Sequence, residues 1–79
     1  MFKIDFPIYK SNPDLVYLDS GATAQKPQAV IDYMNEYMSK FNSNVHRGIY
    51  KISEKATEEY ERSRIIIQKF INAKSANEI

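Results

Sequence analysis

The chain has 79 residues, of which 43% are hydrophobic and 27% charged, and its formal net charge is +1. This composition is typical of a globular protein, and so small a net charge excludes the strong positive field that would gather nucleic acid or anionic lipid. The absence of cysteine and the single histidine exclude disulfides, thiol chemistry and a zinc site of the usual kind. A chain this short buries only about 60% of its unfolded surface, so we expect it to need a partner or more polypeptide.

Membrane and export signals are also missing from the sequence. The longest purely aliphatic run is Ile65–Ile67, far below the ~20 residues of a membrane-spanning helix. Met1–Asp5 does not lead into the apolar stretch of a signal peptide. The sequence therefore predicts a cytoplasmic protein whose partners include no membrane and no nucleic acid.

The first third of the chain has the features of one or two short strand-like segments. Phe2–Phe6 alternates apolar and charged residues, which fits a short strand or a frayed helical turn before Pro7. Leu15–Leu18 has the β-branched and aromatic content of a buried strand and stops at Asp19–Gly21. The small residues at this stop leave the backbone accessible, so a ligand can approach the main chain there.

Two principal helices are expected, over residues of about 27–41 and 53–72. Pro27 suits the first position of a helix, and Ser53 is the expected N-cap of the second one. Apolar residues at helical spacing form one face of the first helix, which we expect to be core: Val30, Tyr33, Met34, Tyr37, Met38 and Phe41.

The end of the second helix suggests unfinished packing. Ile65, Ile66 and Ile67 point about 100° apart around a helix, so one neighbouring helix cannot bury all three. We therefore expect a homo-oligomer with Ile65, Ile66 or Phe70 near the contact. Ser75–Glu78 has the pattern of a capping box and predicts a further helical turn.

Three blocks of residues occur in an order and spacing that point to one family. The blocks are Tyr17-Leu18-Asp19-Ser20-Gly21-Ala22-Thr23-Ala24-Gln25-Lys26-Pro27, then Asn44-Val45-His46-Arg47-Gly48-Ile49, then Ser53-Glu54-x-Ala56-Thr57 with Tyr60-Glu61 and Arg64. Together they resemble the N-terminal part of the group II cysteine desulfurases, which are pyridoxal-phosphate enzymes of the class V aminotransferase type. Gly21 is a departure, since the family more often has alanine there.

The resemblance implies a fold class and a domain assignment. The fold class is mainly α with one or two short strand-like segments, as the N-terminal fragment of an α/β fold-type I pyridoxal-phosphate enzyme. Residues 1–79 would then be a single incomplete domain of a larger enzyme. Family members are several times longer than this chain.

The resemblance also implies a reaction and a cofactor. Family enzymes take sulfur from L-cysteine for iron–sulfur cluster assembly, and they leave L-alanine and an enzyme persulfide. They need a lysine that binds pyridoxal phosphate, an aspartate for its ring nitrogen, an arginine for the substrate carboxylate and a nucleophilic cysteine. By resemblance all four lie beyond Ile79, so we expect no catalytic residue, no bound cofactor and no activity in the isolated chain.

The resemblance assigns five candidate substrate-binding residues. Gly21, Ala22 and Thr23 match a segment that lines the substrate pocket, where small side chains let a ligand reach the backbone. His46 and Arg47 match a loop at the active site near the dimer interface, where they can hydrogen-bond a ligand or hold a carboxylate. On pattern alone, an ordinary turn is the favoured interpretation of the first segment, and a solvated loop residue is the favoured interpretation of His46.

Two other functions stay open on the sequence. A free-standing helical module could bind a protein partner through the helix that carries Ile65–Ile67. Other class V enzymes, such as kynureninase-like or epimerase-like ones, share the overall fold. The Asn44–Gly48 block favours the desulfurase over those relatives.

Overall fold

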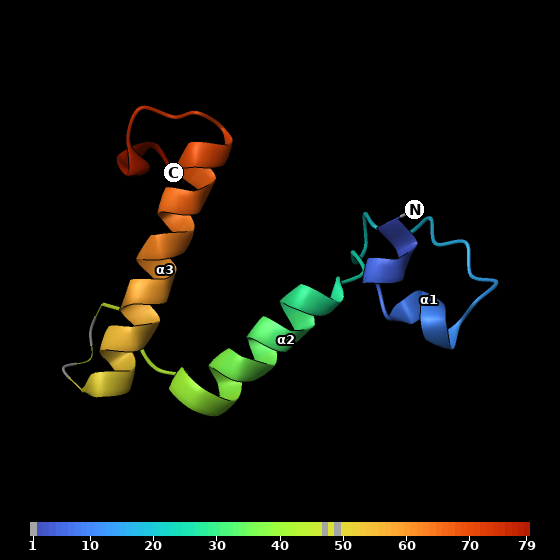
Figure 1. Cartoon of the computed structure of the whole chain (residues 1–79), viewed down its shortest axis with the longest axis horizontal. Helices are drawn as coiled ribbons and strands as arrows, with labels where there is room; N and C mark the ends of the chain where they lie inside the picture. The colour runs from blue at the N-terminus through green and yellow to red at the C-terminus, as the bar shows by residue number, and fades with distance from the viewer. Residues whose placement is uncertain (1, 47, 49) are drawn as a thin grey trace. The chain divides into compact units, whose positions relative to one another are not determined.

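The structure is a computed structural model that describes residues 2–46, 48 and 50–79. It forms two compact units, Met1–Glu36 and Tyr37–Ile79, and each is described by itself (Figure 1). The described residues are mainly helical, which confirms the mainly α class, and they contain no strand, so the expected strand-like segments are wrong. The assignment of residues 1–79 to one incomplete domain stays a prediction.

The first unit begins with two short helical turns, η1 (Phe2–Asp5) and α1 (Ile8–Ser11). The Phe6 amide donates to the carbonyl of Lys3 at 3.1 Å, so this segment satisfies its backbone locally instead of pairing with a second strand. The rings of Phe6 and Tyr9 meet edge to face at 6.5 Å between centroids. Of the two alternatives for Phe2–Phe6, the helical turn before Pro7 is therefore confirmed and the strand is wrong.

The second expected strand, Leu15–Leu18, has no regular secondary structure. Val16 is 73% exposed and Leu18 is 91% exposed. A strand forms when neighbouring backbone and side chains cover it, and the described residues supply neither.

The first expected helix is divided between the two units. In the first unit, α2 (Gln28–Glu36) begins after Pro27, whose carbonyl accepts from the amides of Val30 and Ile31. In the second unit, η2 (Tyr37–Phe41) is a π-helical turn. The predicted core face is wrong for most of its members, since Tyr33, Met34 and Met38 are 45–57% exposed, whereas Phe41 is buried at 5%.

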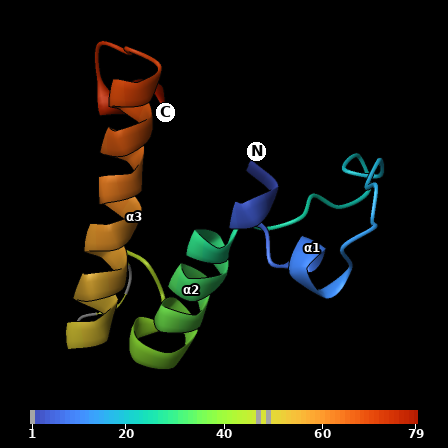
Figure 2. The ribbon, with the colours of Figure 1, turned by 45° about the vertical axis from the view of Figure 1, so that its right-hand side comes forward.

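The second unit is built on α3 (Lys51–Phe70), and the loop that follows η2 folds along its first turns in both views (Figures 1 and 2). Phe41 and Ala56 are buried, and Ser53 is completely buried. Tyr37 contacts Phe41 edge to face at 5.2 Å. These contacts give the second unit a small core where α3 begins.

Ser53 does not cap α3, contrary to the sequence prediction. The helix begins at Lys51 with Tyr50 as its N-cap residue, and no side chain makes a capping hydrogen bond there. The Ser53 hydroxyl instead donates to the Asn44 carbonyl at 2.6 Å. A long-range partner has replaced the local cap, so Ser53 fixes the loop against the helix.

The C-terminal end of α3 is closed by two local motifs. Asn72 has φ 58, its amide donates to Lys69, and the Ala73 amide donates to Gln68 at 2.9 Å, which is the Schellman pattern. The chain then turns back beside α3 to η3 (Ala76–Glu78), visible in red in Figures 1 and 2. Ser75 and Glu78 form the predicted capping box, with both reciprocal hydrogen bonds present.

The apolar residues of the last turns of α3 are open to solvent. Ile65, Ile66 and Ile67 are 45–56% exposed, and Phe70 is 89% exposed. Among the described residues, no helix is long and apolar enough to cross a membrane.

Candidate substrate-binding loop

The loop that carries His46 is fixed at both of its sides by α3. On one side, the Ser43 hydroxyl lies 3.1 Å from the carbonyls of both Phe41 and Ile52. On the other side, Gly48 lies so close to Ser53 that a Cβ at this position would collide with the Ser53 side chain. Since Ser53 is completely buried, only glycine permits this approach.

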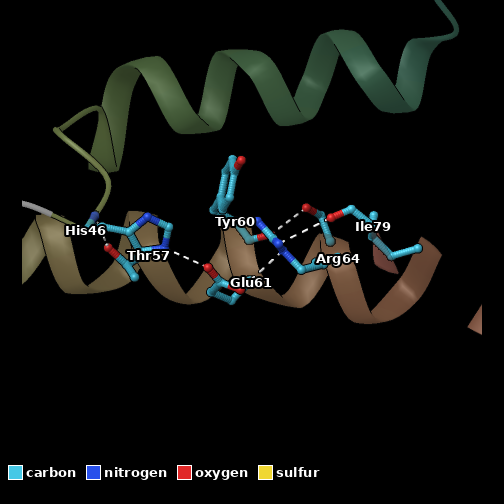
Figure 3. A network of polar contacts seen from close by, with 7 residues as sticks. His46, Thr57, Tyr60, Glu61, Arg64 and Ile79 are labelled. Carbon is cyan, nitrogen blue, oxygen red and sulfur yellow. Dashed lines mark hydrogen bonds and ion pairs between the residues drawn. The ribbon is translucent and has the colours of Figure 1, made fainter. Parts of the chain in front are cut away.

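His46 itself has three contacts with α3. Its backbone is in the left-handed region at φ 66, and its amide donates to the Thr57 hydroxyl at 2.9 Å. Its Nε2 lies 2.6 Å from Glu61 Oε1. Its ring meets the Tyr60 ring edge to face, at 5.4 Å between centroids and an interplanar angle of 87°. Figure 3 shows His46 lying over this part of the helix.

The carboxylate of Glu61 is held in turn by Arg64. Arg64 Nε lies 3.5 Å from Glu61 Oε2, and Arg64 Nη1 donates to the Ile79 carbonyl at 3.3 Å (Figure 3). The Arg64 guanidinium also lies 5.8 Å from the centre of the Tyr60 ring. Each oxygen of Glu61 therefore has its own cationic or proton-donating partner.

An open hollow borders His46. Its lining includes His46, Gly48, Glu54, Thr57 and Glu58. The two carboxylates favour a ligand that carries a positive group, and the imidazole of His46 remains 48% exposed at the edge. The carboxylates of Glu54 and Glu58 thus give this open hollow a negative lining beside the imidazole of His46.

The other predicted segment, Gly21–Thr23, lies in the first unit and forms a turn. The Asp19 carbonyl accepts from the amides of Ala22 and Thr23, at 3.0 and 3.2 Å. The Tyr17 hydroxyl donates to the carbonyl of Thr23 and lies 3.3 Å from that of Asp19. All three candidate residues of the segment are exposed, and Ser20 and Ala24 on either side line a separate open hollow.

The structure thus brings His46 into a polar network, whereas Gly21, Ala22 and Thr23 belong to the other unit. Arg47 lies outside the described residues. Substrate binding by these five residues stays a prediction.

Sequence reasoning did not single out the partners of His46. Thr57, Glu61 and Arg64 appeared only as matches to a family pattern, yet their spacing of four and three residues places them on one face of a helix. That stripe of polar residues was the available signal. What the sequence lacked was the fold of the loop that brings His46 onto the stripe.

The lysines of the chain all lie on its surface. A lysine that reacts with a carbonyl needs a pocket that favours its neutral form, but all eight lysines are exposed. Lys55 is paired with Glu59 at 2.8 Å, and Lys26 donates to the carbonyl of Ala24. No cluster of three metal-ligating side chains occurs among the described residues either.

Comparisons with known proteins agree with the sequence resemblance. The family model for aminotransferase class-V matches residues 16–79. A protein named cysteine desulfurase SufS, from Plasmodium falciparum, is 49% identical over 74 residues, which cover 94% of this chain. Among solved structures, the apo cysteine desulfurase of Thermococcus onnurineus matches 91% of the chain at 40% identity, with a TM-score of 0.72.

The chain therefore belongs to the aminotransferase class-V family, and within it the chain is similar to cysteine desulfurases. It spans only a small part of these relatives, 14% of the Plasmodium protein and 17% of the Thermococcus chain.

Proposed function

We propose that this chain forms one wall of the substrate site of a pyridoxal-phosphate-dependent cysteine desulfurase acting on L-cysteine. The observation that carries the proposal is the fixed position of His46, with its amide on Thr57 and its ring on Glu61. These residues lie within the blocks that match the family. A solvated loop histidine would contact water in place of these residues of α3.

In this proposal each residue contacts a different part of the amino acid. His46 hydrogen-bonds the ammonium or thiol group, and the carboxylates of Glu54 and Glu58 favour the positive end of the substrate. Arg47, in the matching His-Arg-Gly block, can hold a carboxylate or a neighbouring acid beside the site. Gly21, Ala22 and Thr23 are candidates by the family resemblance alone, since they belong to the other unit.

The isolated chain is expected to be catalytically inactive. It has no cysteine to accept sulfur, and its exposed lysines provide no selective site for the cofactor. After incubation with pyridoxal phosphate and borohydride reduction, we expect scattered adducts on several lysines. A single stoichiometric adduct on one lysine would contradict this part of the proposal.

The proposal is tested by a chimera. Residues 1–79 replace the matching segment of the Thermococcus onnurineus cysteine desulfurase, and alanine production from L-cysteine is measured. We expect an active chimera whose kcat/KM falls about tenfold or more on His46→Ala or Arg47→Ala. Full activity of both variants would mean that His46 and Arg47 are solvated loop residues that do not contribute to the site.

The left-handed backbone of His46 calls for a matched control. His46→Asn keeps a residue that tolerates φ 66 and removes the imidazole. If the ring binds substrate, asparagine and alanine variants lose similar activity. If backbone strain is the cause, the asparagine variant keeps the activity of the parent chimera.

We also propose that the exposed end of α3 associates with a second copy of the chain. Phe70 and Ile66 are 89% and 56% exposed, and burying such residues is the main driving force of association. Light scattering after size exclusion should show a dimer or larger species that Phe70→Asp and Ile66→Asp dissociate. A monodisperse monomer at high micromolar concentration would contradict this proposal.

A further inference from the structure

We propose that Glu61 is a positioning residue for His46, which it holds as the Nε2–H tautomer so that Nδ1 becomes the hydrogen-bond acceptor offered to substrate. This inference rests on the proposed function for its substrate, L-cysteine, and on the geometry of the described residues for everything else. Two further residues support this pair: Thr57 holds the backbone of His46, and Arg64 holds the carboxylate of Glu61.

The protonation pattern follows from the chemistry of the pair. An ionised carboxylate can only accept hydrogen bonds, so the 2.6 Å contact between Glu61 Oε1 and His46 Nε2 requires the proton on Nε2. In a neutral imidazole the other nitrogen then carries a lone pair. In this form Nδ1 can accept from the ammonium or thiol of L-cysteine and cannot donate to it.

The orientation of the ring is fixed independently of its tautomer. The bond from the His46 amide to Thr57 sets the backbone at 2.9 Å, and the edge-to-face contact with Tyr60 restricts rotation of the imidazole. With its amide on Thr57, its ring against Tyr60 and its Nε2 on Glu61, His46 contacts three residues within about one turn of the same helix. A helix is a more precise support for a site than a loop.

Arg64 makes the carboxylate itself a fixed acceptor. Its Nε lies 3.5 Å from Glu61 Oε2, the oxygen that does not contact His46. Because Glu61 is 45% exposed and Arg64 is 30% exposed at the side chain, the ion pair adds little stability in water. Its role here is to hold the carboxylate in one orientation.

The test uses the 79-residue chain itself, in which His46 is the only histidine. Long-range nitrogen–proton spectra at alkaline pH report the tautomer of this one ring. We expect the Nε2–H form alone in the parent chain, with cross-relaxation between the His46 and Tyr60 rings. Glu61→Ala should give a mixture of both tautomers and weaker ring contacts.

Two further variants separate positioning from general effects. Glu58→Gln removes a carboxylate from the same helix and the same hollow, and it should leave the tautomer unchanged. Glu61→Gln keeps an oxygen that can accept from Nε2, so it should restore part of the tautomer preference that alanine loses. Circular dichroism checks that each variant retains its helices.

A tautomer mixture in the parent chain, or identical spectra for the parent and Glu61→Ala, would overturn the proposal. These results do not depend on catalysis, so they stand even if the chimera is inactive and the proposed function fails. In an active chimera, Glu61→Ala should lower kcat/KM about tenfold, and adding it to His46→Ala should cause no further loss. Additive losses would show that Glu61 acts other than through His46.

Discussion

The two units of the chain use different kinds of contact. In the first unit, η1, α1 and α2 contain no buried residue, and the polar contacts are local, as between the Tyr17 hydroxyl and Asp19 or between Gln28 and Asp32. In the second unit, contacts join residues 9 to 15 positions apart, as from Ser53 to Asn44 and from His46 to Glu61.

The difference shows why residues distant in the sequence hold the loop at His46, whereas the turn at Gly21–Thr23 has only local contacts. Long-range contacts order a loop only when the chain closes on itself, which costs conformational entropy that buried residues must offset. The buried Phe41, Ser53 and Ala56 do this in the second unit. The turn at Gly21–Thr23 has only its own hydrogen bonds.

The largest expected effect is on the small core of the second unit. Phe41→Ala should lower the free energy of unfolding by about 3–5 kcal/mol, which is much of the about 4–12 kcal/mol expected for 79 residues. Phe2→Ala is the matched control, since Phe2 is 73% exposed, and it should change the free energy by less than about 0.5 kcal/mol. Urea unfolding measures both, and equal effects would contradict the location of the core.

A smaller loss is expected where the His46 loop meets α3. Gly48→Ala places a Cβ against the buried Ser53 and 2.9 Å from Tyr50 Cε1, and such overpacking costs about 1–3 kcal/mol. It should also weaken the ring contact between His46 and Tyr60. Unchanged stability would show that Gly48 and Ser53 are not in close contact.

At the end of α3, substitution of Asn72 should change the free energy of unfolding by about 1–2 kcal/mol. Asn72 has φ 58, a conformation that alanine adopts at a cost of about 1–2 kcal/mol and glycine adopts freely. Thermal unfolding should therefore place Asn72→Ala below the parent chain and Asn72→Gly at or above it. The reverse order would contradict the left-handed turn at Asn72.

The smallest effect is expected at Gly21, where the family more often has alanine. An added Cβ meets no atom within 4 Å, and the φ of Gly21 is not positive. Gly21→Ala should therefore be neutral or stabilise the chain by about 0.4–1 kcal/mol, because it restricts the unfolded state. A loss of stability would mean that the turn needs the freedom of glycine.

Sequence reasoning succeeded where structure is decided locally. The capping box at Ser75–Glu78 needs only residues three positions apart, and both of its hydrogen bonds are present. Local spacing also indicated helix over most of α3. It failed at Ser53, because a hydroxyl that could cap a helix found the Asn44 carbonyl instead.

The sequence-based prediction of the strand-like segments was wrong, and the partners of His46 were missed, for a related reason. A strand at Leu15–Leu18 depends on neighbours, and the described residues leave Leu18 91% exposed. The partners of His46 lie 11 and 15 residues away, so no local pattern links them. The family resemblance pointed to His46, and the fold was needed to find Thr57 and Glu61.

The central claim is that this chain itself holds His46 in place on α3. Amide hydrogen exchange measures this directly, because the His46 amide is bonded to the Thr57 hydroxyl. We expect this amide to exchange more slowly than those of the exposed Val16 and Leu18, and Thr57→Val to remove its protection. Exchange of the His46 amide as fast as that of an unstructured peptide would contradict the account.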